Sequence, residues 1–197
     1  MKPFLIFTLI LSCFLTQAQD WELKKNKNEI KIYTRKSDTS EIKEYKAVMK
    51  VNSSMQKALD VITDGNSVFE WTHNTSASKT LSVISENELI IWIKNDMPWP
   101  VQDRDHISRL CIEQNENTIY IDLLPGPSGE MPLDDNCIRI TNFKGAWIIK
   151  KVDPTTIEVT QRMYGDPNGS IPLWLLNSML ATHPYHSFLN LKDILEN

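Results

Sequence analysis

Apolar and polar residues alternate strictly along residues 42–51. Tyr45, Ala47, Met49 and Val51 share one face of an extended chain, and the opposite face carries charged residues. This period of two predicts a strand that is buried on one side only.

Strand-forming segments account for most of the rest of the chain. Two short pieces lie between Trp21 and Arg35, and a Pro/Gly-rich loop, 125–135, interrupts a later series of strands. That series is predicted at 79–85, 88–94, 104–113, 118–124, 137–142, 146–152 and 156–164. Because short turns join most of these segments, we expect consecutive strands to be antiparallel neighbours.

Helical spacing replaces this alternation at two places. Asn52-Ser53 can cap a helix over residues 55–62, and 68–71 form a short second helix; we expect this insert after the second strand. A long helix is predicted from its cap at Ser170 to Glu196, with Pro172 in the first turn, where proline is tolerated.

This order of elements predicts an α+β fold. One curved antiparallel sheet would wrap around the long C-terminal helix, with its polar face outward. Because the sheet is too large for one helix to fill its concave side, we expect a ligand cavity between them.

The first 19 of the 197 residues form a segment of different character. Lys2 precedes an apolar run from Phe4 to Leu15 that is too short to span a bilayer, and Thr16-Gln17-Ala18 offers small residues for cleavage. We therefore expect a signal peptide over 1–19 and one exported domain over 20–197, periplasmic or secreted. The alternative is a lipoprotein acylated at Cys13, to which Phe14-Leu15 fit poorly.

Charge and cysteine content narrow the range of partners. The formal net charge is −4, and no basic cluster is present, so we expect no nucleic-acid partner. We place Cys111 and Cys137 on strands with one strand between them, which is too far for a disulfide, and expect both to be free and buried.

Three segments carry a family likeness in their order along the chain. They are Trp21-Glu22-Leu23 with Ile30–Arg35, Trp99-Pro100-Val101 with Asp103-Arg104-Asp105, and Gly169–Asn177. Together they resemble the START-domain family in its bacterial branch, within the helix-grip (Bet v 1-like) superfamily. The resemblance runs from Trp21 to about Leu195. It implies a helix-grip fold, a hydrophobic tunnel under the C-terminal helix, and binding of a lipid or sterol without chemistry.

Some members of that family carry a buried acid–base pair that touches the ligand. In this sequence Leu110 stands where a cavity-facing arginine would be expected. The resemblance therefore gives no polar ligand pair for this chain.

The charged triplet Asp103-Arg104-Asp105 is the first candidate for chemistry. Adjacent strand residues point to opposite faces, and the arginine would keep both carboxylates ionised, which does not suit acid–base catalysis. We predict that Arg104 and Asp105 brace a loop through charge-assisted hydrogen bonds, and that no residue is catalytic. The alternative is a cyclase- or hydrolase-type enzyme that uses His106 and Asp105 in the same cavity.

The histidines give little support for a metal site. His183 and His186 have helical spacing, but no third ligand is evident nearby and Pro184 disturbs that turn. We predict no metal and no cofactor.

The expected cavity and its helical lid supply the candidate binding residues. Gln161 is a polar residue among apolar ones on its strand, and its amide would bond either the ligand or the closing helix. The full set of candidates is Trp92, Trp99, Leu110, Gln161, Met163, Trp174, Leu175 and Met179. We expect a monomeric, non-enzymatic carrier or sensor of a lipid or sterol-like molecule, which touches membranes only transiently.

Overall fold

The structure is a computed structural model that describes residues 21–37, 40–169 and 171–197. The predicted signal peptide over 1–19, acylation at Cys13 and the helix cap at Ser170 lie outside the described residues.

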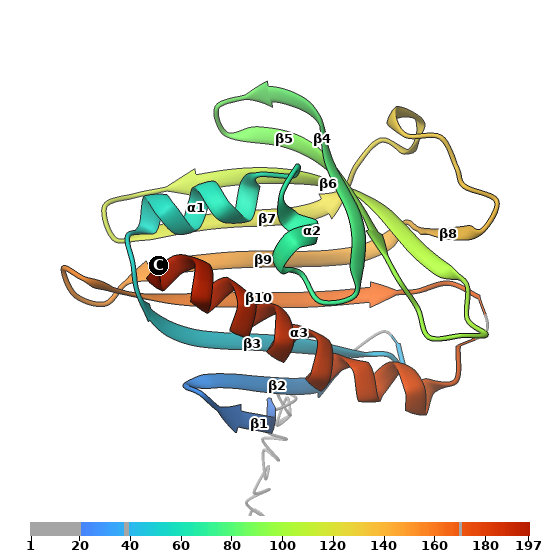
Figure 1. Ribbon diagram of the computed structural model, residues 1–197, viewed down its shortest axis with the longest axis horizontal. Helices are drawn as coiled ribbons and strands as arrows, with labels where there is room; N and C mark the ends of the chain where they lie inside the picture. The colour runs from blue at the N-terminus through green and yellow to red at the C-terminus, as the bar shows by residue number, and fades with distance from the viewer. Residues whose placement is uncertain (1–20, 38–39, 170) are drawn as a thin grey trace, which may run out of the picture.

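Within that part of the chain, ten strands form one sheet, which curves behind the helices in Figure 1. The strand order is β1-β2-β3-β10-β9-β7-β6-β5-β4, and β8 pairs with β6 beside this path. The strands are β1 (Glu22–Lys27), β2 (Ile30–Lys36), β3 (Lys43–Asn52), β4 (Thr75–Ser85), β5 (Glu88–Asn95), β6 (Asp103–Gln114), β7 (Thr118–Pro125), β8 (Cys137–Ile140), β9 (Asn142–Lys151) and β10 (Thr156–Asp166). The predicted α+β fold, a curved antiparallel sheet with a long C-terminal helix, is confirmed.

The helices are α1 (Met55–Thr63), α2 (Val68–Trp71) and α3 (Leu173–Glu196), with a 3-10 turn η1 at Ser128–Glu130. The cap of α1 is Ser54, one residue later than predicted, and its hydroxyl accepts a hydrogen bond from the Lys57 amide at 3.1 Å. Pro172 occupies the cap position of α3, so the helix begins after this proline and not before it.

The helical insert follows the third strand, which corrects the predicted position after the second. Asn28 and Glu29 have positive φ angles of 53° and 62°. Two consecutive positive angles are typical of a type I′ hairpin turn, so the segment before residue 37 forms two full strands. The sequence pattern had placed the turn two residues too early, within Asn26–Asn28, and had left these strands short.

One strand pair is parallel, contrary to the expectation of antiparallel neighbours. Segment 126–136 carries the chain back to β6, where β8 pairs in parallel and Cys137 stands opposite Asp103. Cys111 and Cys137 therefore lie on adjacent strands, but their positions are eight residues apart in register, about 26 Å. Both are free, as predicted, and both are half-buried where burial was expected.

The core lies between the sheet and the second half of α3. Phe188, Leu191 and Leu195 are buried, and the Phe188 ring stacks on Trp147 of β9 at 5.7 Å between centroids. This half of the helix packs on β2 and β3, while α1 covers β7 and β9. Because these contacts fill only part of the inner face, a space remains under the first half of α3.

Candidate functional site

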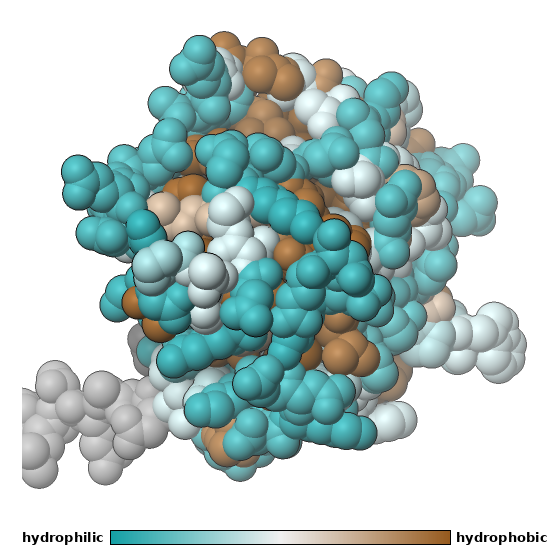
Figure 2. Space-filling view, turned by 60° about the vertical axis from the view of Figure 1, so that its left-hand side comes forward, coloured by the Kyte–Doolittle hydropathy of each residue, from teal (hydrophilic) through white to brown (hydrophobic). Residues whose placement is uncertain are grey.

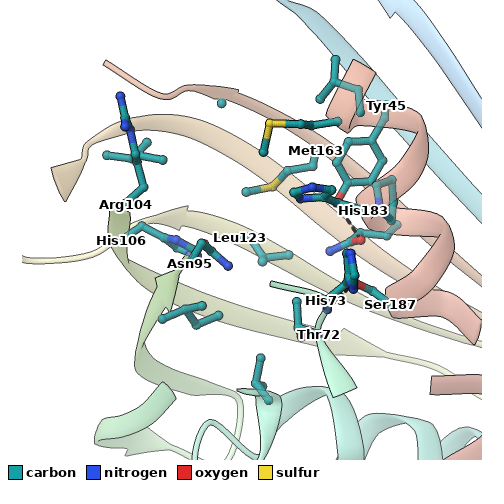
Figure 3. Close-up of a pocket in the computed structure, with 18 of the residues that line it drawn as sticks. Tyr45, Thr72, His73, Asn95, Arg104, His106, Leu123, Met163, His183 and Ser187 are labelled. Atoms are coloured by element: carbon teal, nitrogen blue, oxygen red, sulfur yellow. Dashed lines mark hydrogen bonds between the residues drawn. The ribbon is translucent and has the colours of Figure 1, made fainter. Parts of the chain in front are cut away.

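A cavity of about 280 Å³ occupies the space between the sheet, α2 and the first half of α3. Most of its wall is apolar, and ten of the described helices and strands contribute to it. Representative side chains are Ile91, Leu110, Leu123, Trp147, Met163 and Leu176. Figure 3 shows the polar side chains that interrupt this wall, gathered toward its two ends.

Four of the predicted binding residues lie in the cavity wall. They are Leu110 on β6, Gln161 and Met163 on β10, and Met179 on α3. Their contact with a ligand stays a prediction.

Trp92 was predicted in the wall and is on the other side of the sheet. Its neighbours Ile91 and Ile93 line the cavity, so the alternation along β5 turns Trp92 outward. There its indole N–H donates a hydrogen bond to Asp105 at 2.8 Å.

The other three candidates also lie outside the wall. Trp99, between β5 and β6, is 92% exposed, and Trp174, in the first turn of α3, is 73% exposed. Leu175 is half-buried, whereas the next residue, Leu176, is buried and lines the cavity. The first half of α3 is apolar all round, so its sequence could not tell which side faces inward.

Two side chains form a hydrogen-bonded pair at one end of the cavity. The Tyr45 hydroxyl on β3 donates to Oε1 of Gln161 at 2.9 Å, drawn as a dashed line in Figure 3. Gln161 is therefore bonded to a tyrosine of the neighbouring strand β3. The closing helix, which the sequence had suggested as a possible partner, does not provide this bond. Burial raises the pKa of Tyr45, so its hydroxyl stays protonated and can donate.

Arg104, His106 and Asn95 stand at the opposite end in Figure 3. Burial lowers the pKa of His106 to about 4, although the neighbouring Asp105 carboxylate acts in the opposite direction. The imidazole is therefore neutral near pH 7, and it packs edge-on against Phe143 with centroids 5.3 Å apart.

Arg104 and Asp105 hold two different loops from opposite faces of β6. The Arg104 guanidinium donates to the backbone carbonyls of Gln102, Pro167 (3.2 Å) and Asn168 (2.9 Å). It thus fastens the turn before α3 to the start of β6.

The Asp105 carboxylate forms an ion pair with Arg139 of β8, at 2.5 Å from Nη2, and not with Arg104. Arg139 also donates to carbonyls of residues 128, 131 and 132, so the pair secures the segment around η1. Burial disfavours the charged carboxylate, but hydrogen bonds from Arg139 and Trp92 outweigh it and hold the pKa of Asp105 below its usual value.

The alternative function, a cyclase- or hydrolase-type enzyme, requires His106 and Asp105 to act together in the cavity. His106 lines the cavity while Asp105 is buried behind the sheet, so the two groups do not meet. A catalytic pair made of these residues is wrong for this structure.

Three histidines meet where α3 crosses the segment after α2. The His73 ring lies 5.3 Å from that of His183 and 4.8 Å from that of His186, between centroids. Burial, together with His73 and His186, lowers the pKa of His183 to about 4. In the described ranges, no group of three or more His, Cys, Asp or Glu side chains is arranged to hold a metal ion.

Several residues of the wall were not predicted from the sequence. Tyr45 shares the inner face of β3 with Ala47, so its alternation was a usable signal, whereas His73 and Ser187 meet only through tertiary packing. The indole N–H of Trp71 and the hydroxyl of Thr72, both wall residues, are buried without a hydrogen-bond partner.

The outer surface differs from the cavity wall. The face in Figure 2 is mostly hydrophilic, with apolar residues in separate patches. Along residues 21–37, 40–169 and 171–197, no helix is long and apolar enough to cross a bilayer.

Both a family model and a curated relative match most of the chain. The family model of the START domain matches residues 11–186. The phosphatidylcholine transfer protein of Mus musculus is 25% identical over 164 residues, which cover 80% of this chain and 75% of the relative.

Solved structures are similar over most of the chain. A StAR-related lipid transfer protein from Xanthomonas axonopodis has a TM-score of 0.81 and 28% identity, and the match covers 89% of this chain and 98% of the other. Human StAR-related lipid transfer protein 5 has a TM-score of 0.80 and 15% identity, with 89% and 86% covered. An aromatase/cyclase from Streptomyces is a more distant match in fold, with a TM-score of 0.51, 10% identity and 77% and 90% covered.

Proposed function

Because the chain belongs to the START-domain family, we propose that it binds a hydrophobic small molecule, a lipid or sterol-like compound, in the cavity under α3. It carries or senses this ligand and does not transform it. The observation that carries the proposal is the apolar cavity between the sheet and the helix. Protein interiors are normally close-packed, so stability of the fold alone does not require such a cavity.

The size and lining of the cavity support a ligand of modest size. Its volume of about 280 Å³ is near the lower end of ligand pockets, roughly 300–1,000 Å³. Burying apolar ligand surface against residues such as Leu110 and Met179 supplies the main driving force.

A binding role also agrees better with the chemistry of the wall than an enzymatic one. A cyclase or hydrolase needs at least one convergent pair of groups to move protons. His106 is neutral and stands beside Asn95, which does not titrate, and its sequence neighbour Asp105 is on the other face of β6. His73 and His183 meet in the wall, but burial lowers the pKa of both, so both are neutral near pH 7 and neither supplies the acid of such a pair. The names of the similar transfer proteins support the same choice.

Export to the periplasm or the extracellular space is part of the proposal, on the strength of the apolar run Phe4–Leu15. Intact-mass measurement of the exported form should give a chain beginning near residue 20. An acylated Cys13 at the N-terminus would show lipoprotein anchoring in its place.

The monomer would exchange its ligand during brief contact with a membrane. The connection between β5 and β6 and the start of α3 lie at the same end of the molecule in Figure 1. The first carries Trp99 and the second Trp174, and both side chains are exposed. Tryptophan favours the membrane interface. The double change Trp99→Ala and Trp174→Ala should slow ligand transfer between vesicles while leaving binding in solution intact; unchanged transfer would rule out this contact.

The binding function is tested by filling the cavity. Met179→Trp places a large ring in the wall, whereas Ser178→Trp places the same ring on the exposed side of α3. Fluorescence titration with Nile red should show loss of binding in the first variant only. Equal binding by both folded variants would contradict the proposed site.

A further inference from the structure

We propose that the ligand carries an uncharged hydrogen-bond acceptor, such as a ketone, ester or amide carbonyl, and that the side-chain amide of Gln161 receives it. This inference rests on the proposed binding function and specifies the chemical class of the ligand.

The wall of the cavity is nearly free of charge. No Asp, Glu or Lys among the described residues contributes to it. Its histidines are His73, His106 and His183, and burial lowers the pKa of each, to about 4 for His106 and His183. Arg104 is the exception, and backbone carbonyls of residues 102, 167 and 168 accept from its guanidinium. Figure 3 places Arg104 at the end of the cavity away from Tyr45, the partner of Gln161.

A charged ligand group would lose its hydration in such a site without gaining a counter-ion. Transfer of an unpaired ion to an apolar environment is far more costly than transfer of a hydrogen-bonded neutral group. The phosphate and the quaternary ammonium of a choline phospholipid would both be unpaired beside Gln161. The wall therefore favours a neutral head group.

Gln161 is oriented to donate. Its Oε1 already accepts the Tyr45 hydroxyl proton, which directs the –NH2 group away from that contact. Within the described structure this –NH2 group has no hydrogen-bond partner, and Gln161 lies in the cavity wall. An amide donor inside an apolar cavity calls for an acceptor, and the ligand is the molecule that can bring one.

The neighbours of Gln161 in the sheet do not supply an acceptor for its –NH2 group, which leaves that role to the ligand. In register it stands between Ala47 of β3 and Trp147 of β9, and Met163 follows it on the inner face of β10. None of these side chains offers an oxygen acceptor. Tyr45 is thus a positioning residue, because it fixes which end of the amide faces the cavity.

The test uses four probes with the same twelve-carbon chain. Methyl dodecanoate carries a neutral acceptor, dodecane carries none, and dodecanoate and dodecyltrimethylammonium carry opposite charges. Displacement of bound Nile red gives their relative affinities. We expect methyl dodecanoate to bind about tenfold tighter than dodecane, the effect of one hydrogen bond to a buried donor, and tighter than either ion.

Three variants locate the effect. Gln161→Leu should remove the preference for the ester while retaining dodecane binding, and Tyr45→Phe should reduce it because the amide can then rotate. Gln114→Leu, an exposed glutamine on the same sheet, is the matched control and should keep the wild-type preference. Thermal melts of each variant establish that it is folded, and if Gln161→Leu fails to fold, Tyr45→Phe still tests the inference.

The outcomes separate this inference from the proposed function. Equal binding of ester and dodecane, tightest binding of either ion, or an unchanged preference in Gln161→Leu would overturn the inference and leave the hydrophobic site standing. Failure of the folded wild-type protein to bind Nile red or any probe would overturn both.

Discussion

At the scale of single residues, the Asp105–Arg139 ion pair is the interaction whose loss has the clearest consequence. Both side chains are almost fully buried, at 3% and 6% exposure. Breaking a buried pair by removing one partner leaves an uncompensated charge and typically costs about 3–5 kcal/mol.

We therefore expect Asp105→Asn to lower the free energy of unfolding by about 3 kcal/mol without changing ligand specificity, and Arg139→Met to do much the same. Urea denaturation measures both, and the double variant should lose less than the sum of the single losses. Glu88→Gln is a control, because its ion pair with Arg109 is partly exposed and worth at most about 1 kcal/mol. Wild-type stability of Asp105→Asn would refute the brace.

The alternation of residues along a strand was informative only where it was known which face of the strand points into the cavity. Alternation along residues 156–164 predicted Gln161 and Met163 on the inner face, and they lie there. Leu110, which the family resemblance placed at a cavity-facing position, also lies in the wall. Trp92 was assigned by its aromatic character against the alternation of Ile91 and Ile93, which explains the error. Arg139 could not be found as the partner of Asp105, because a parallel strand returned from a distant segment brings it there.

At the scale of elements, helix α3 is the part of the fold expected to respond to the ligand. Its first half lines the cavity through residues such as Leu176 and Met179, while Phe188 and Leu191 of its second half are buried against the sheet. Pro184 lies between the two halves and removes one helical hydrogen bond.

Hydrogen exchange with and without a bound hydrophobic ligand should therefore show added protection at residues 173–183 and little change at 185–195. Loss of one hydrogen bond at Pro184 allows the first half to open by itself. Uniform protection of the whole helix in both states would mean that α3 is static and would refute its role as a lid.

The histidine contact between α3 and the segment after α2 makes stability depend on pH. The pKa of His183 in the folded chain is about 4, below the value of about 6.5 for an exposed histidine. The unfolded chain therefore takes up this proton first as pH falls. The stability linked to His183 is complete above about pH 6.5 and is lost progressively as pH falls toward 4.

His183→Asn should reduce this loss by about 1–2 kcal/mol between pH 7 and pH 4.5, after allowance for the partial exposure of the ring. His106, with a similar pKa, supplies a separate part of the wild-type loss that the variant retains. Urea denaturation at the two pH values gives the comparison. An identical pH dependence in the variant would show that His183 does not contribute.

The order of elements was predictable because each has its own period and turn signals. The position of the helical insert was not, since the hairpin at Asn28 and Glu29 depends on a turn that the local pattern placed too early. The parallel pairing of β8 depends on the path of a long loop, which periodicity does not report.

At the scale of the whole molecule, the sheet, α2 and α3 surround an apolar cavity whose polar groups are neutral near pH 7, apart from the engaged Arg104. A sequence can predict that such a sheet is too large for one helix to fill. It cannot give the volume or the polar pairs, because these depend on side chains from strands far apart in the chain, such as Tyr45 and Gln161.

The most direct test of ligand binding is native mass spectrometry of the protein purified without detergent, followed by solvent extraction of what it carries. We expect a single adduct of one small, uncharged hydrophobic molecule per chain, which is absent from folded Met179→Trp and present in Ser178→Trp. A protein that is always free of ligand, or an adduct that folded Met179→Trp keeps in full, would contradict the account.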